Sequence, residues 1–125
     1  MTLSTETKGV YAIAPTPFLP DGAVDWDSVD RMTDFYIECG VHGLTILGIM
    51  GEAQKLEPAE SLRLVKQIIG RFGGRPVVVG VSSPGFAAMR SLARQAMEEG
   101  AAGVMIAPPP AMRTDDQIAG YYAQA

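Results

Sequence analysis

Residues Gly43-Leu44-Thr45-Ile46-Leu47-Gly48 form a short, almost wholly apolar run with a glycine at each end. A continuous apolar run of this length is typical of a strand covered on both faces, as in a parallel sheet. Three further runs have the same character, namely Val10–Pro15, Pro76–Val81 and Gly103–Pro108. The four runs begin at residues 10, 43, 76 and 103. A spacing of about 30 residues is the length of one strand, one helix and two turns.

The segments between these runs have the periodicity of amphipathic helices, in which apolar residues recur every three or four positions. The first predicted helix ends at Gly40, the second begins at Pro58, the third ends at Gly100, and the fourth opens with the capping-box pair Thr114 and Gln117. Their apolar stripes are, in chain order, Val29, Met32, Phe35, Tyr36 and Cys39; Leu62, Val65 and Ile69; Met89, Leu92, Ala93 and Ala96; and Ile118, Tyr121, Tyr122 and Ala125.

Four strand–helix units in a row predict a parallel α/β sheet, either half of a barrel or a small doubly wound sheet. The turn Gly40-Val41-His42-Gly43 recurs 60 residues later as Gly100-Ala101-Ala102-Gly103, two units further along. The last apolar helical face continues to Ala125 without a cap. A (βα)8 barrel takes about 250 residues. We therefore expect residues 1–125 to be the amino-terminal half of a single (βα)8 barrel domain.

Composition narrows the class of protein. The chain is 47% hydrophobic and 19% charged, with a net charge of −4 and no basic face, so we expect no nucleic-acid partner. No apolar run approaches the roughly 20 residues that span a bilayer, and the polar residues 1–9 do not resemble an export signal. A single cysteine forms no intrachain disulfide and favours the cytoplasm. We expect neither a metal nor a cofactor.

In parallel α/β folds the ligand binds at the carboxyl ends of the strands. After the second predicted strand, Gly48 and Gly51 bracket two apolar residues just before a helical segment. Such a segment can present a row of backbone N–H groups to a carboxylate or phosphate, or it can be a plain strand-to-helix turn. Isolated glycine pairs are weak indicators, so both interpretations stay open on spacing alone.

Other chemically capable residues are expected to be structural. His42 precedes a strand, at the stability face of a barrel, and Cys39 is predicted to be a buried, inert thiol. Glu52 is expected to brace its loop rather than to act as a base, and Tyr121 and Tyr122 to pack. An acidic stretch consists of Asp21, Asp25, Asp27, Asp30 and Asp34. Its spacing does not match a calcium loop, and these aspartates are expected to cap a helix and form a solvated face.

Several segments, taken in order, resemble the dihydrodipicolinate synthase and N-acetylneuraminate lyase family. Ala12–Phe18, followed by an Asp-Gly turn, resembles the family's first strand, and Gly48–Ala53 stands where the family has Gly-Thr-Thr-Gly-Glu. Leu56 and the helix containing Glu60 continue the match. Pro76–Val81 and Ala101–Pro108 resemble the third and fourth strands. The resemblance extends from Lys8 to Ala125.

This resemblance implies a (βα)8 barrel and a class I aldolase mechanism. A lysine on the sixth strand forms a Schiff base with pyruvate or another 2-oxo acid, and a tyrosine on the fifth strand moves protons. Backbone donors of the glycine loop, here Gly48, Ile49, Met50 and Gly51, bind the carboxylate. Neither the lysine nor the tyrosine is expected within residues 1–125, which reach only the helix after the fourth strand, and Lys8, Lys55 and Lys66 are poor substitutes because none lies at a strand end. The isolated chain is therefore expected to be inactive, and the parent protein to be a homodimer or homotetramer.

Two departures from the family's pattern involve the same proton relay. Ile49 and Met50 replace the paired threonines, and Pro108-Pro109-Pro110 replaces a Pro-Tyr-Tyr run whose second tyrosine crosses a subunit interface. They favour a divergent lyase, acting in aldol cleavage, aldol addition or dehydration. The alternative is a non-catalytic member that binds a small carboxylate. A phosphate-binding barrel of another family is disfavoured, because its phosphate loops usually follow strands seven and eight.

Overall fold

The computed structural model describes residues 1–125 as four successive strand–helix units. Its strands are β1 (Tyr11–Ile13), β2 (Gly43–Ile46), β3 (Val77–Gly80) and β4 (Gly103–Met105). Its helices are α1 (Trp26–Glu38), α2 (Pro58–Arg71), α3 (Phe86–Glu98) and α4 (Asp115–Gln124), with a short 3₁₀ turn, η1 (Ala53–Lys55). The strands are parallel in the order β1-β2-β3-β4, so the predicted partial α/β barrel is confirmed.

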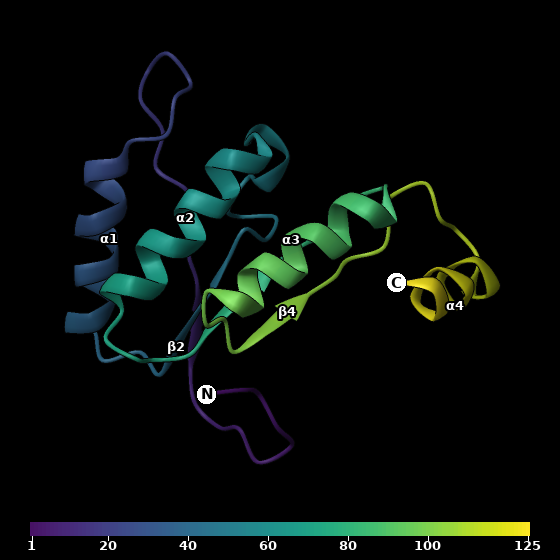
Figure 1. Ribbon diagram of the computed structural model, residues 1–125, viewed down its shortest axis with the longest axis horizontal. Coiled ribbons are helices and arrows are strands. Elements are labelled where there is room, and N and C mark those ends of the chain that lie inside the picture. Colours follow the sequence, from purple (N-terminus) through teal and green to yellow (C-terminus); the bar gives the residue numbers. More distant parts are fainter.

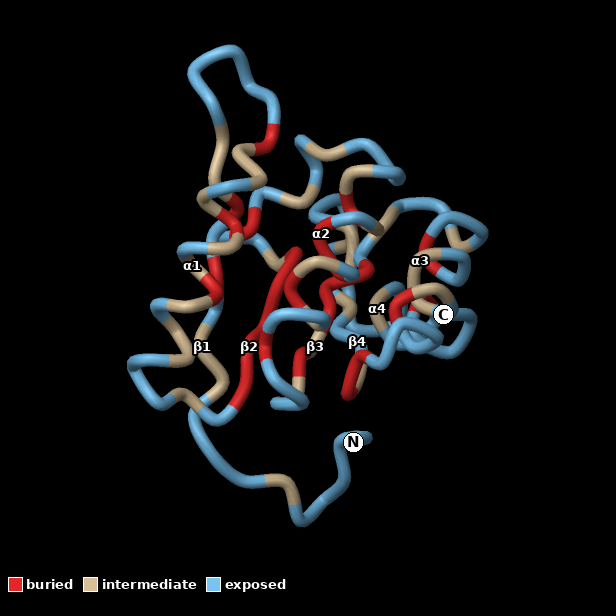
Figure 2. Tube along the Cα trace, turned by 60° about the vertical axis from the view of Figure 1, so that its left-hand side comes forward, coloured by how far each residue is buried: buried red, intermediate tan, exposed pale blue.

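The helices cover one face of this sheet. α1 packs on α2 and α2 on α3, as Figure 1 shows, and α4 follows β4 and packs near the amino end of α3, where Tyr121 contacts Phe86. The side chains of β2 and β3 that face the helices are fully buried, and β2 is the most completely covered strand (Figure 2), whereas Val104 of β4, in the same register row as Val79, is 37% exposed. The fully buried members of this core include Leu44, Ile46, Leu64, Ile68, Phe72, Val77, Val79 and Val81.

Local sequence explains where the helices begin and end. The Asp25 carboxylate accepts a hydrogen bond from Ser28 N and caps α1, while capping boxes begin α2 at Glu57 and α4 at Thr114. Gly40 has a φ of +73° directly after α1, a conformation that L side chains adopt reluctantly. The predicted stops and the predicted capping box of the last helix are confirmed.

Two residues of the predicted α1 stripe are not buried. Cys39 is exposed, and Phe35 is 57% exposed. At about 100° per residue, Phe35 lies about 120° and Cys39 about 80° around the helix from the fully buried Val29. The prediction of a buried Cys39 thiol was therefore wrong. In α2 the stripe is also wider than predicted, because Leu64 and Ile68 are fully buried together with the predicted Val65.

The opposite face of the sheet, here called the inner face, corresponds to the interior of a barrel. One register row across it contains Ile13, Thr45, Val78 and Gly103. Near the amino ends of the strands, the segment Leu3–Gly9 covers this face, and Leu3 N donates to Ala102 O at 2.8 Å. Near the carboxyl ends it is open, and Ile13 and Met105 are partly exposed.

Candidate functional site

The carboxyl end of β2 turns sharply into the segment Gly48–Gly51, here called the β2 turn. Leu47 has a φ of +56°, which ends the strand before the predicted boundary at Gly48. Gly51 N donates to Gly48 O at 3.1 Å, and Glu52 N donates to Ile49 O at 3.0 Å. These two bonds fold the segment into a tight loop at the rim of the sheet.

Three consecutive backbone donors of the β2 turn have no partner in the chain. The N–H groups of Gly48, Ile49 and Met50 make no hydrogen bond to any backbone or side-chain acceptor, whereas those of Gly51 and Glu52 are used within the turn. Adjacent unpaired N–H groups form an anion-binding concavity. The donors available to a carboxylate are therefore those at the start of the loop.

Neighbouring strands hold the β2 turn in place. The buried Thr16 hydroxyl, just after β1, donates to Gly51 O at 2.6 Å. Gly80, at the end of β3, approaches the Leu47 carbonyl so closely that no Cβ fits between them. The terminal methyl of Met105 lies beside Gly48. Residues from β1, β3 and β4 thus converge on one loop.

The remaining strand ends use their polar groups internally. The Ser82 hydroxyl accepts from Ala107 N at 2.8 Å, and the Ser83 hydroxyl accepts from Gly85 N at 3.3 Å. Tyr121 of α4 packs against Phe86 as predicted, whereas Tyr122 is 44% exposed, and both tyrosines also form hydrogen bonds. Tyr121 is buried and donates to Ser83 O at 3.3 Å, and Tyr122 donates to Ile106 O at 2.9 Å.

His42 and Glu52 have the structural roles expected from the sequence. The Nδ1 atom of His42 accepts from Val10 N at 2.9 Å, which joins the approaches to β1 and β2 at the amino end of the sheet. Glu52 pairs with Lys55 at 2.7 Å across η1, and both side chains are solvated. His42 therefore lies at the end of the sheet opposite the β2 turn.

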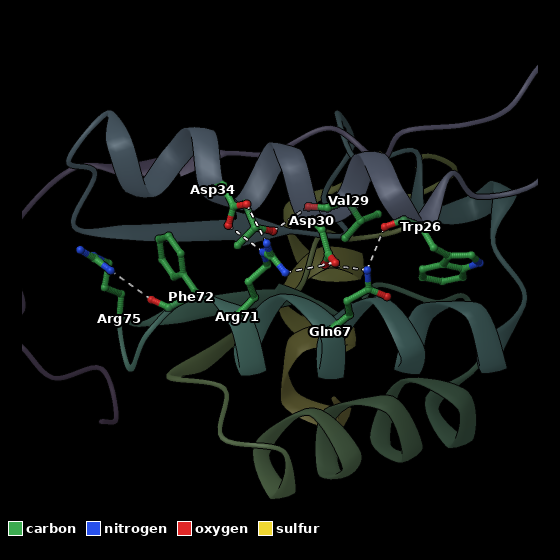
Figure 3. Close-up of polar contacts among 9 residues, drawn as sticks. Trp26, Val29, Asp30, Asp34, Gln67, Arg71, Phe72 and Arg75 are labelled. Atoms are coloured by element: carbon green, nitrogen blue, oxygen red, sulfur yellow. Dashed lines mark hydrogen bonds and ion pairs between the residues drawn. The ribbon is translucent and has the colours of Figure 1, made fainter.

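The acidic stretch has a second role that the sequence did not indicate. Asp25 caps α1 as predicted, but Asp30 and Asp34 face α2 and bind Arg71 (Figure 3). Arg71 donates from Nε and Nη2 to the two oxygens of Asp34, at 2.6 and 2.7 Å, and its Nη1 lies 3.2 Å from Asp30. The Arg71 hydrogen bonds lower the pKa of Asp34, and the same bonds raise the pKa of Arg71. This cluster joins two helices far from the β2 turn.

A shallow cavity of about 320 Å³ lies at the amino ends of the strands. It is lined by the amino-terminal segment, including Lys8, and by the inner-face residues Tyr11, Thr45 and Val78. No cluster of histidine, cysteine or carboxylate side chains is arranged to bind a metal ion. No helix is long and apolar enough to cross a bilayer.

Comparison with known proteins identifies the architecture. The model of the dihydrodipicolinate synthetase family matches residues 6–124. The 4-hydroxy-tetrahydrodipicolinate synthase of Stenotrophomonas maltophilia R551-3 is 37% identical over 121 residues, which are 94% of this chain and 41% of that protein. The chain belongs to the dihydrodipicolinate synthetase family.

Solved structures agree with this assignment. The dihydrodipicolinate synthase of Rhodopseudomonas palustris superposes with a TM-score of 0.92 at 56% identity, covering 99% of this chain and 41% of that one. The pyruvate complex of the chloride-inhibited synthase from Acinetobacter baumannii gives a TM-score of 0.83 at 28% identity, covering 93% of this chain and 41% of that one. The chain thus spans about two fifths of the length of these relatives.

Proposed function

We propose, from this family membership, that residues 1–125 are the amino-terminal half of a (βα)8 barrel lyase that acts on pyruvate or a related 2-oxo acid. Relatives are 4-hydroxy-tetrahydrodipicolinate synthases, and one related structure contains pyruvate. The reaction class is the making or breaking of a carbon–carbon bond next to the ketone, or a dehydration, through a Schiff base.

The observation that carries this proposal is the row of unpaired donors in the β2 turn. Ile49 N and Met50 N are adjacent, unpaired and located at the carboxyl edge of the sheet. In the proposed complex they hold the carboxylate of the 2-oxo acid, which sets the orientation of its ketone. Backbone donors are independent of side-chain identity, so this role is compatible with Ile49 and Met50 in place of threonines.

The Schiff-base lysine of the proposed enzyme comes from another part of the barrel. Lys55 pairs with Glu52, Lys66 lies 3.2 Å from Glu99 on the outer surface, and Lys8 lines the cavity at the opposite end of the strands. None of the three lies at the end of a strand, because Lys8 precedes β1, Lys55 is in η1 and Lys66 is in α2. We therefore propose that the isolated 125-residue chain forms no covalent adduct and is inactive, and that the complete protein is a cytoplasmic homo-oligomer.

A second function is favoured by one observation. The strand ends lack the hydroxyls of the family's proton relay, since Ile49, Met50 and Pro110 occupy those positions. A protein that binds a small carboxylate without turning it over would tolerate this loss. It would keep the donors of the β2 turn and dispense with the lysine.

Borohydride trapping separates these two functions. The complete protein containing this chain is incubated with pyruvate and sodium borohydride, and its intact mass is measured. The lyase predicts a stoichiometric increase equal to one reduced pyruvyl group. Pyruvate binding by calorimetry without any adduct would favour the carboxylate binder, and neither binding nor adduct would contradict both.

A further inference from the structure

The Thr16 hydroxyl has a fixed position between β1 and the β2 turn. Thr16 stands between Pro15 and Pro17, and a residue that precedes proline is restricted to extended backbone. Just before this segment, Ala14 N donates to β2 at 2.9 Å, which ties the end of β1 to its neighbour. The Thr16 side chain is buried, and its hydroxyl donates to Gly51 O at 2.6 Å. A stiff segment therefore presents this donor to the turn.

The hydrogen bond from Thr16 fixes a peptide unit at the closing end of the β2 turn. Gly51 O and Glu52 N belong to one peptide unit, and the C=O and N–H bonds of a trans unit point in opposite directions. The chain has no cis peptide bond. Thr16 binds the oxygen of this unit, and Glu52 N donates to Ile49 O at 3.0 Å on the other side. The unit is therefore held at both ends.

A second peptide unit extends this constraint to a free donor. Ile49 O and Met50 N belong to the same unit, so the hydrogen bond from Glu52 N to Ile49 O directs the Met50 N–H to the opposite side. The Met50 N–H is one of the three unpaired donors of the β2 turn. Hydrogen bonds in such a series also polarise one another, which strengthens the last donor. A buried hydroxyl beside β1 thus orients an N–H group that is available to a ligand.

We infer that Thr16 is a positioning residue for the carboxylate of the 2-oxo acid, acting through the Gly51–Glu52 and Ile49–Met50 peptide units. This inference rests on the proposed binding of a 2-oxo acid by the β2 turn. Every group in the series belongs to residues 1–125, so the series is complete without the remaining strands of the proposed barrel. Without the hydroxyl, the buried Gly51 O lacks its donor, and the peptide unit that aligns the Met50 N–H loses its anchor.

Thr16→Val and Thr16→Ser test this role in the complete protein containing this chain. The dissociation constant of pyruvate is measured by calorimetry, and urea unfolding shows that each variant is folded under the titration conditions. Thr16→Val should raise the dissociation constant by about tenfold or more, because one hydrogen bond to a charged group contributes about tenfold to 100-fold in affinity. Thr16→Ser keeps the hydroxyl and should bind pyruvate almost as tightly as the wild type.

Thr33→Val is the matched control for Thr16→Val. Thr33 is buried in α1 and its hydroxyl donates to Val29 O at 2.8 Å, so this substitution also removes a buried hydrogen bond. It lies outside the series that ends at Met50 and should leave the dissociation constant of pyruvate unchanged. A folded Thr16→Val protein that is less stable but binds pyruvate as tightly as the wild type would show a structural role only and overturn the inference.

Thr16→Cys keeps the inference testable if Thr16→Val does not fold. The cysteine side chain has the shape of serine with a weaker donor, so Thr16→Cys should bind pyruvate more weakly than Thr16→Ser. Equal pyruvate affinity of the two variants would overturn the inference.

The outcomes distinguish this inference from the proposed function. Wild-type protein that binds pyruvate, together with a folded Thr16→Val variant of equal affinity, would leave the proposed function intact and overturn the role of Thr16. Wild-type protein that does not bind pyruvate would overturn both.

Discussion

Gly80→Ala tests whether the packing of β3 against Leu47 holds the β2 turn in its binding geometry. A Cβ added at Gly80 would lie 2.6 Å from the carbonyl carbon of Leu47, whereas ordinary contacts begin at 3.4 Å. The Leu47 carbonyl oxygen lies closer still, so Leu47 must move by more than about 0.8 Å; both partners are buried backbone, which makes this an overpacking change. Because Leu47 directly precedes the turn, the movement displaces the N–H groups of Ile49 and Met50.

We expect two effects of Gly80→Ala in the complete protein. The free energy of unfolding, measured in urea, should fall by about 1–3 kcal/mol, as is usual for overpacking. The kcat/KM for pyruvate should fall by about 100-fold, because a displacement near 1 Å costs that much in positioned sites.

Gly70→Ala is the matched control for Gly80→Ala. Gly70 lies within α2 and a Cβ there meets nothing within 4 Å, so the substitution should stabilise the protein by about 0.5–1 kcal/mol and leave kcat/KM unchanged. A Gly80→Ala protein with the stability and kcat/KM of the wild type would refute the reasoning.

Three further expectations follow from other contacts. Thr16→Val removes the hydrogen bond to Gly51 O and leaves a buried carbonyl without its donor, so the free energy of unfolding in urea should fall by about 1–3 kcal/mol. Thr16→Ser keeps the hydroxyl and should remain close to the wild type. Equal stability of the Val and Ser variants would count against this role. Arg71 lowers the folded-state pKa of Asp34 below 3.8, so this pair stabilises the fold above pH 3.8 and the contribution disappears as the pH falls through the folded pKa. The difference in free energy of unfolding between the wild type and Arg71→Ala should therefore shrink on acidification. Urea unfolding at several pH values in low salt measures this difference, and a difference that stays constant would contradict the expectation. The isolated 125-residue chain has open edges at β1 and β4 and an inner face that is open near the carboxyl ends of the strands. Sedimentation should therefore show association, and a monomer with a cooperative unfolding transition would contradict this expectation.

Most of the fold could be predicted because glycine, proline and apolar runs carry local information. The left-handed stop at Gly40 and the capping box at Thr114 depend on neighbours within a few residues. The strand boundaries were too long by one to three residues at the carboxyl ends. The positive φ of Leu47, which ends β2, has no signature in its side chain.

Other features depend on contacts between distant residues. Arg71 and Asp34 are 37 positions apart, and only the packing of α1 on α2 brings them together. Periodicity likewise gave the spacing of Phe35 and Cys39 but not the direction in which α1 faces the sheet, so the burial of both was overestimated. The β2 turn was predicted as a binding loop, whereas the identity of its three unpaired donors required the hydrogen-bond pattern of the folded chain.

The proposed binding of a 2-oxo acid by the β2 turn is tested most directly by a crystal structure of the complete protein with pyruvate. The account predicts that the pyruvate carboxylate oxygens lie about 2.7–3.2 Å from Ile49 N and Met50 N, as hydrogen bonds require. A pyruvate carboxylate bound elsewhere in the barrel, with these two N–H groups facing water, would contradict it.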